Sequence, residues 1–188
     1  MSLKLSTKLS ASLNTLICSS LLLLSASVHA TTPPVDFFDD EDVSSKSWKE
    51  LAPKLPAAPK SEDLKDFYVS PRETMTSRID LSSITVGTDG VIHYTLVITS
   101  PSGAVNTSYE GIRCETAEKK TYAYGQADGS WMKSQNQDWK RIADIQANRQ
   151  QAALYKDYFC QGNTIAGKAS DMINRIRNNK PFESYKIN

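Results

Sequence analysis

The chain has 188 residues with 22 basic and 21 acidic side chains, and its formal net charge at pH 7 is +1. This balance excludes the strongly basic surface with which proteins bind nucleic acids or anionic membranes. The length is sufficient for a single domain with a hydrophobic core.

Residues 1–30 have the pattern of a cleavable export signal. A lysine-bearing start precedes the apolar stretch 16–24, and small residues lead to Val28 and Ala30 at an A-x-A-like cleavage site. A membrane anchor is the alternative, but the apolar stretch is shorter than the ~20 residues that a spanning helix needs. Lipidation is disfavoured because Cys18 lies inside that stretch. We therefore expect cleavage after Ala30, no transmembrane segment in the mature chain, and residence in the periplasm with possible outer-membrane association.

Residues 31–66 are predicted to form a proline-rich, acidic N-terminal arm. Five of the eight prolines lie here, and prolines disfavour long helices and strands. The acidic tract 36–42 contains Phe37 and Phe38, so it is either a solvated run or a docking segment anchored by these two rings. A short helix is expected to start at residues 47–50, with Trp48 packing the arm back onto the domain.

Residues 67–188 are predicted to be a single α+β domain. Val91–Thr99 alternates between two apolar faces, which favours a central strand, and glycine-containing turns at 87–90 and 100–103 flank it closely. Such short connections indicate an antiparallel β-meander rather than parallel βαβ units. The expected strand segments are 67–69, 74–79, 84–86, 91–99, 104–116 and 121–124.

The chain changes to a helical period after Trp139. A helix is expected over 145–159, and a second one, with Thr164 as its N-cap, ends near Arg177. The predicted fold is therefore an antiparallel sheet covered on one face by C-terminal helices.

Cys114 and Cys160 are predicted to form one disulfide. Cleavage after Ala30 removes Cys18, and the two remaining cysteines enter an oxidising compartment. A redox-active pair is the alternative, but the two residues lack the CxxC spacing of such enzymes. The bond would join a strand to the end of the covering helix.

Few residues of the chain are candidates for catalytic chemistry. His93 is the one histidine after residue 30, and no G-x-S-x-G signature accompanies it, so a structural role is expected. A lone histidine beside two bridged cysteines cannot supply a zinc site, and no cofactor motif occurs. The acids Glu110, Glu115 and Glu118 are expected to face solvent. We therefore predict a protein that is not an enzyme and that has no cofactor.

Two segments are candidates for a binding surface. Trp131 and Trp139 flank a polar stretch and would either grip a sugar or a protein partner or cap the edge of the sheet. Tyr109, Glu110 and Arg113 are a second group. Strand alternation separates Glu110 from Arg113, so pairing them would need a bulge at Gly111.

The sequence resembles the cryptic neisserial protein family, a group of exported betaproteobacterial proteins with no assigned reaction. The resemblance covers most of the chain after residue 30 and implies residence in a Gram-negative envelope. His93 stands where the family commonly has an arginine. The resemblance rests on Trp48-Lys49-Glu50, Leu55-Pro56, Pro59, Gly103 to Asn106, Tyr109 to Cys114, Tyr122 to Gly125, Trp131, Trp139 and Tyr158-Phe159-Cys160.

These observations favour an exported, non-enzymatic protein-interaction module of the cell envelope, with another envelope protein as its partner. A periplasmic small-ligand-binding protein with Trp131 and Trp139 at its mouth is the first alternative, and a hydrolase is the second. A pocket between sheet and helices would favour the small ligand, and a filled core would favour the interaction module.

Overall fold

The computed structural model describes residues 48–143 and 145–182, and within them seven strands form one antiparallel sheet. Six of the strands follow one another in meander order, and β7 pairs beside β6 on β5. The predicted α+β meander is confirmed. The strands are β1 (Leu64–Asp66), β2 (Thr76–Val86), β3 (Val91–Thr99), β4 (Val105–Arg113), β5 (Glu118–Gly125), β6 (Trp131–Lys133) and β7 (Lys140–Arg141).

Alternation along β3 divides its side chains between two covered faces. Tyr94 and its same-face neighbours Ile92 and Leu96 point into the main core, beneath the C-terminal helices. His93 lies on the opposite face and is also buried. Both faces of this strand are therefore covered, as predicted for a central strand. Because the helices lie on the inner face, a non-helical segment must cover the outer face.

Tight hairpins set the register of this sheet. Gly90 donates its backbone N–H to the carbonyl of Gly87 (3.0 Å) between β2 and β3, and Gly103 does the same to Ser100 (2.9 Å) between β3 and β4. Both glycines have φ near +80 to +88°, which side chains disfavour. These turns align β3 with both neighbours.

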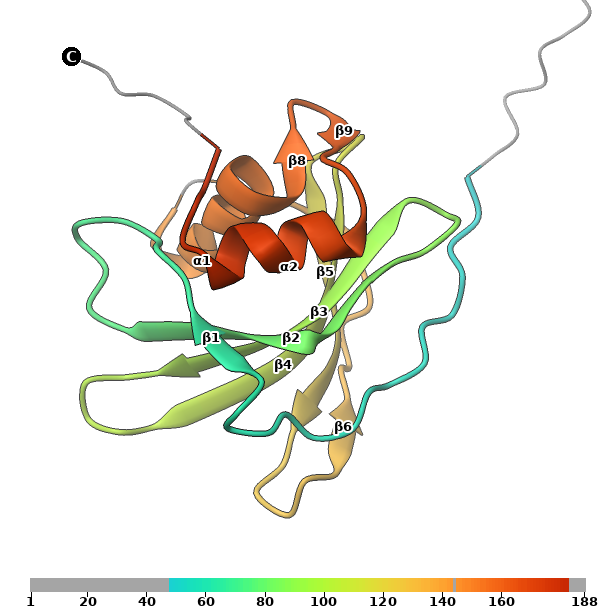
Figure 1. The fold of residues 1–188 in the computed structure, drawn as a ribbon. Coiled ribbons are helices and arrows are strands. Elements are labelled where there is room, and N and C mark those ends of the chain that lie inside the picture. The colour runs from blue at the N-terminus through green and yellow to red at the C-terminus, as the bar shows by residue number, and fades with distance from the viewer. Residues whose placement is uncertain (1–47, 144, 183–188) are drawn as a thin grey trace, which may run out of the picture. The chain divides into compact units, whose positions relative to one another are not determined.

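Two helices cover the inner face of the sheet, as Figure 1 shows. After the 3₁₀ turn η1 (Gln146–Asn148), α1 (Arg149–Ala153) continues as the π-helical η2 (Leu154–Phe159), and α2 (Ala169–Arg177) follows. The core between helices and sheet is filled by apolar side chains from both layers.

The predicted start of the second helix at Thr164 is wrong. Thr164 belongs to β9 (Thr164–Ile165), which pairs with β8 (Cys160–Gln161) around a turn at Gly162. The helix begins after Lys168, whose backbone N–H donates to the carboxylate of Asp171 (2.8 Å). The residues between the two helices therefore form a small hairpin instead of starting the second helix.

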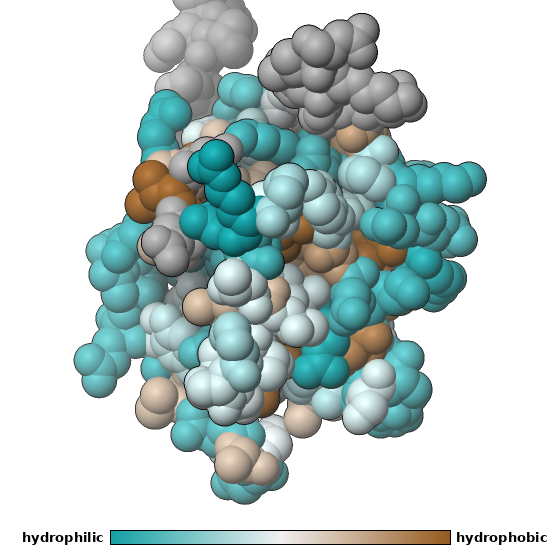
Figure 2. Space-filling model, turned by 90° about the vertical axis from the view of Figure 1, so that its left-hand side faces the viewer, coloured by the Kyte–Doolittle hydropathy of each residue, from teal (hydrophilic) through white to brown (hydrophobic). Residues whose placement is uncertain are grey.

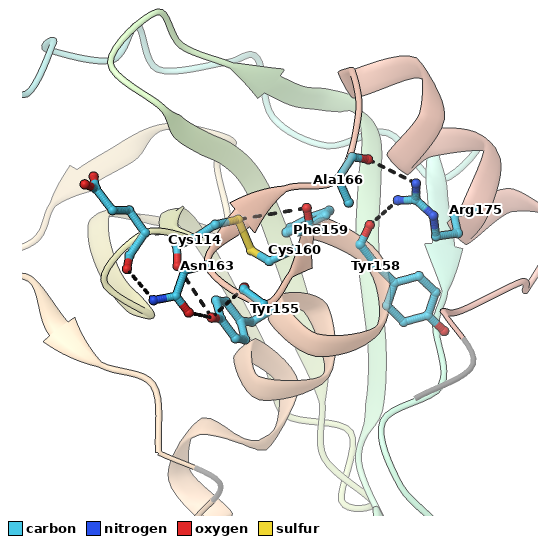
Figure 3. Close-up of a disulfide and its surroundings, with 10 residues drawn as sticks. Cys114, Tyr155, Tyr158, Phe159, Cys160, Asn163, Ala166 and Arg175 are labelled. Atoms are coloured by element: carbon cyan, nitrogen blue, oxygen red, sulfur yellow. Dashed lines mark hydrogen bonds between the residues drawn. A yellow bond between two sulfur atoms is a disulfide. The ribbon is translucent and has the colours of Figure 1, made fainter. Parts of the chain in front are cut away.

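The predicted disulfide is confirmed. Cys114 follows β4 and Cys160 follows η2, with their Cα atoms 5.6 Å apart and both side chains buried. Figure 3 shows that hydrogen bonds support the helical end of this bridge. The Tyr155 hydroxyl donates to the carbonyl of Gly162 (2.9 Å), and the Arg175 guanidinium donates to the carbonyls of Tyr158 and Ala166.

The described part of the predicted arm packs against the sheet. β1 pairs with β2, so the sheet begins before residue 67, the expected domain start. Residues 48–59 run in extended conformation along the opposite side of the sheet from the helices, shown in cyan in Figure 1. Phe37, Phe38 and the predicted signal at residues 1–30 lie outside the described residues. Within the described part, no helix is long and apolar enough to cross a bilayer.

Candidate functional site

Five rings gather on the outer face of the sheet, and we call this group the aromatic face: His93, Tyr109, Tyr122, Trp131 and Trp139. The ring centroids of Tyr109 and Trp131 lie 6.1 Å apart, and those of Tyr122 and Trp139 lie 6.5 Å apart. His93 packs against both tyrosines, with centroids 6.0 and 5.4 Å away, and the two tyrosine rings lie 5.9 Å from each other. The structure thus brings together four of the predicted binding residues, because Arg113 lies 5.9 Å from the centre of the Trp139 ring, on the same face as Tyr109 and Trp131.

A β-bulge places Tyr122 on this face. Tyr109 of β4 pairs with Ala123, and the next residue, Glu110, pairs with Thr121, so Tyr122 is the extra residue on β5. A bulge redirects the side chain of the extra residue, and here it turns the phenol outward. Opposite it, Gly111 leaves room, because a Cβ there would lie 2.9 Å from the Tyr122 ring.

The extended residues 48–59, which we call the strap, lie across the aromatic face. The indole of Trp48 packs edge-on against Trp139, with centroids 5.8 Å apart, and the Arg113 guanidinium lies 3.6 Å from the centre of the Trp48 ring. The Trp48 indole N–H donates to the carbonyl of Asp89 (2.7 Å). The expectation that Trp48 packs the arm onto the domain is confirmed, without the short helix.

The strap is also held farther along its length. The Leu51 backbone N–H donates to the Asp89 carboxylate (2.8 Å), and the Trp131 indole N–H donates to the carbonyl of Pro56 (2.8 Å). The strap makes no strand pairing with the sheet. Side chains of the sheet and its loops, rather than a backbone ladder, therefore hold it.

The carboxylate of Glu50 is the polar centre of the site. It accepts hydrogen bonds from the Lys120 ammonium (2.8 and 3.0 Å), the Tyr122 hydroxyl (2.9 Å) and the Trp139 indole N–H (3.3 Å). Partial burial acts to raise the pKa of Glu50, but the hydrogen bonds from these three donors outweigh it and lower the pKa. Burial, and then the bond to Glu50, raise the pKa of Tyr122, which keeps its proton as a donor.

A pocket of about 430 Å³ lies between the strap and the sheet. Trp131 and Tyr122 supply aromatic walls, and Lys120 and Lys133 supply cations. The strap therefore bridges part of the face without filling it. The pocket is lined by Glu50, Ala52, Pro53, Leu55, Lys120, Tyr122, Trp131, Lys133 and Gln137.

The comparison with known proteins places the chain in a family. Residues 43–177 match the CNP1-like family. The chain belongs to this family. It is 27% identical over 154 residues to "Cryptic neisserial protein 1" of Neisseria gonorrhoeae (strain ATCC 700825 / FA 1090). The aligned region covers 73% of this chain and 75% of that protein. No solved structure matches it significantly. The predicted resemblance is confirmed, and the matched range includes the strap and the aromatic face.

The predicted solvent exposure of Glu110 in this CNP1-like chain is wrong. Glu110 points to the inner face, with 4% of its surface exposed, and accepts hydrogen bonds from Tyr94 (2.9 Å), Ser108 (2.8 Å) and Gln151 (2.9 Å). Strand alternation separates it from Arg113, which lies on the outer face and pairs with Glu115 (3.4 Å) and Glu118 (3.7 Å). Glu110 thus belongs to the core.

His93 is enclosed within the aromatic face of the CNP1-like chain. Burial lowers the pKa of its imidazole, and the carboxylates of Asp89 and Glu50 oppose this effect without cancelling it. The Nε2 atom has no hydrogen-bond partner in the described part of the chain. An enclosed ring that packs against Tyr109 and Tyr122 is the arrangement of a packing residue.

A second cleft, of about 450 Å³, lies between α1 and the loop that follows β1. Figure 2 views the side of the molecule that carries this loop, and there hydrophilic side chains surround small apolar areas. Arg149, one of its basic residues, pairs with Glu73 (3.8 Å). None of the predicted binding residues lines this cleft, so the aromatic face is the stronger candidate.

The sequence does not predict that residues 48–50 and the hydrogen-bond donors on β5 belong to one site. Glu50 lies 70 positions before Lys120 and 89 before Trp139. No local period connects such positions. All three tryptophans of the chain, Trp48, Trp131 and Trp139, belong to this site, but no sequence feature places Trp48 beside the other two.

Proposed function

We propose that this CNP1-like protein is an exported, non-catalytic interaction module of the cell envelope, and that its aromatic face binds a partner protein. The observation that carries the proposal is the seating of an extended polypeptide segment on this face. Two indole N–H groups, of Trp48 and Trp131, bond to backbone carbonyls, and a carboxylate occupies a three-donor site. Aromatic rings with polar ends are common at the centres of protein interfaces.

The filled core supports this proposal over a ligand site between the layers. Tyr94 and Phe159 meet in the core, with ring centroids 5.4 Å apart, and Leu154, Met172 and Ile176 are fully buried there. Periplasmic small-ligand binding is a second candidate, favoured by the pocket of about 430 Å³ beneath the strap.

Export is supported by the pattern of residues 1–30 and by the cysteines. The bridge between Cys114 and Cys160 is typical of oxidising compartments such as the periplasm. Mass spectrometry of the periplasmic fraction should find a mature N-terminus at Thr31. Recovery of the chain with Met1 intact, in the cytoplasmic fraction alone, would contradict export.

Site-specific photo-crosslinking in intact cells tests the interaction. A crosslinker at Lys133, on the rim of the pocket, should give one discrete adduct with an envelope protein, identified by mass spectrometry. The same group at Arg177, exposed on α2 over the opposite face, is the matched control and should not. The adduct should weaken in Trp139→Ala, provided that this variant keeps its circular dichroism spectrum. Equal labelling at both positions, or at neither, would overturn the proposal.

A further inference from the structure

We infer that the strap is an exchangeable occupant of the aromatic face, and that the partner is an extended peptide with a carboxylate two positions after an aromatic residue, which binds in its place. The inference rests on the proposed function and specifies the chemistry of its partner. The strap supplies the template: an aromatic residue, one intervening residue, and then a carboxylate.

The carboxylate site is built entirely from residues outside the strap. Lys120 and Tyr122 come from β5, and Trp139 from the segment before β7. The ammonium of Lys120 lies 5.2 Å from the Tyr122 ring centre and 5.8 Å from that of Trp139, so the rings hold the cation in place. Without Glu50, an ammonium, a phenol and an indole N–H would still converge on one point, which suits a carboxylate.

A second subsite accepts the aromatic residue. In extended chain, side chains two positions apart project to the same side, so Trp48 and Glu50 reach the face together. Trp48 packs against both the Arg113 guanidinium and Trp139, and its N–H donates to the Asp89 carbonyl. A partner with a tryptophan or tyrosine two positions before an acidic residue can make both sets of contacts.

The strap itself is held loosely. The exposed fractions of Trp48, Leu51 and Leu55 are 36%, 48% and 42%. The stretch Ala52–Leu55 spans the pocket of about 430 Å³ without filling it. A partner with a larger side chain at this place would bury more apolar surface than the strap does. The strap retains the advantage of being tethered, because tethering gives it an effective concentration in the millimolar range.

Peptide binding to the full-length mature chain tests the inference. The probe is a fluorescein-labelled peptide with the sequence of residues 48–58, and the receptor is the Trp48→Ala/Glu50→Gln variant, whose strap lacks both anchors. Fluorescence anisotropy should show saturable binding at least tenfold tighter than to the wild type. Binding should fall at least tenfold when glutamine replaces the peptide's glutamate, and likewise in a receptor that also carries Tyr122→Phe.

Hydrogen exchange on the wild-type chain provides a measurement that does not depend on the variant. Millimolar peptide should increase exchange in the strap and leave α2 unchanged. Absence of both binding and strap release would overturn the inference. A concentration-dependent dimer without peptide binding would also overturn it, because the occupant would then be the strap of a second copy. If the Lys133 crosslink persists in either case, the proposed function stands and only the partner's chemistry is refuted.

Discussion

The buried carboxyl group of Glu110 should be one of the largest single contributors to the stability of the domain. Its oxygens accept hydrogen bonds from Tyr94 on β3, Ser108 on β4 and Gln151 on α1. Glu110→Ala removes the acceptor shared by all three donors and leaves them in a space with little access to water. Each buried donor without a partner costs about 1–3 kcal/mol, so we expect the free energy of unfolding to fall by at least about 3 kcal/mol.

Thermal and urea unfolding with the disulfide intact measure this loss. A fall of about 3 kcal/mol corresponds to a decrease in Tm of about 10 °C for a domain of this size. The matched control is Glu115→Ala, which also removes a carboxylate, but one that is 78% exposed and paired with Arg113 at 3.4 Å. Exposed ion pairs contribute about 0–1 kcal/mol, so this variant should unfold almost as the wild type does.

A double-mutant cycle separates the bond across the two layers from the rest. Gln151→Ala removes the donor from α1. The double variant Glu110→Ala/Gln151→Ala should lose less free energy of unfolding than the two single variants together, because the bond they share is counted twice in that sum. Equal stability of Glu110→Ala and Glu115→Ala would refute the reasoning, because it would mean that Glu110 is not enclosed by these donors.

Three further outcomes are expected. Reducing the Cys114–Cys160 bridge, which closes a loop of 46 positions, should lower the free energy of unfolding by about 4 kcal/mol, measured with and without reductant. The folded-state pKa of Glu50 is lowered, so the ionised carboxylate stabilises the fold above pH 4.5, and this contribution is lost as the pH falls through the lowered pKa. Glu50→Gln should flatten this part of the curve of unfolding free energy against pH. His93 has a lowered pKa too, so stability should start to fall below pH 6.5, and His93→Gln should remove that slope while keeping the Lys133 crosslink.

The sheet and the disulfide could be predicted because their signals are local or compositional. The alternation of Val91–Thr99 is a property of nine consecutive residues, and it correctly predicts a strand covered on both sides. Turn glycines such as Gly90 and Gly103 mark the hairpins on either side of it. Cys114 and Cys160 needed no geometric argument, because the predicted cleavage leaves no other pair.

The strap and the core position of Glu110 could not be predicted, for a different reason. A proline-rich segment without periodicity has no local feature that distinguishes packing from solvation, and the contacts of Glu50 reach residues 70 to 89 positions away. An acidic residue is usually exposed. Glu110 is buried because donors 16 and 41 positions away satisfy it, and no pattern in β4 encodes those donors.

The two faces of the sheet differ in how firmly they are closed, and this difference determines where a partner can compete. The inner face carries a continuous apolar core, a covalent bridge and the enclosed Glu110, so opening it would disrupt much of the domain. The strap depends on separate hydrogen bonds and on the partly exposed ring of Trp48. The bond from Trp131 to the Pro56 carbonyl contributes about 0.5–1.5 kcal/mol. The bonds made by the carboxylates of Glu50 and Asp89 contribute about 1.5–3 kcal/mol each. A second peptide can match interactions of that size. The aromatic face is therefore the part of the described domain where we expect a bound segment to exchange while the fold stays intact.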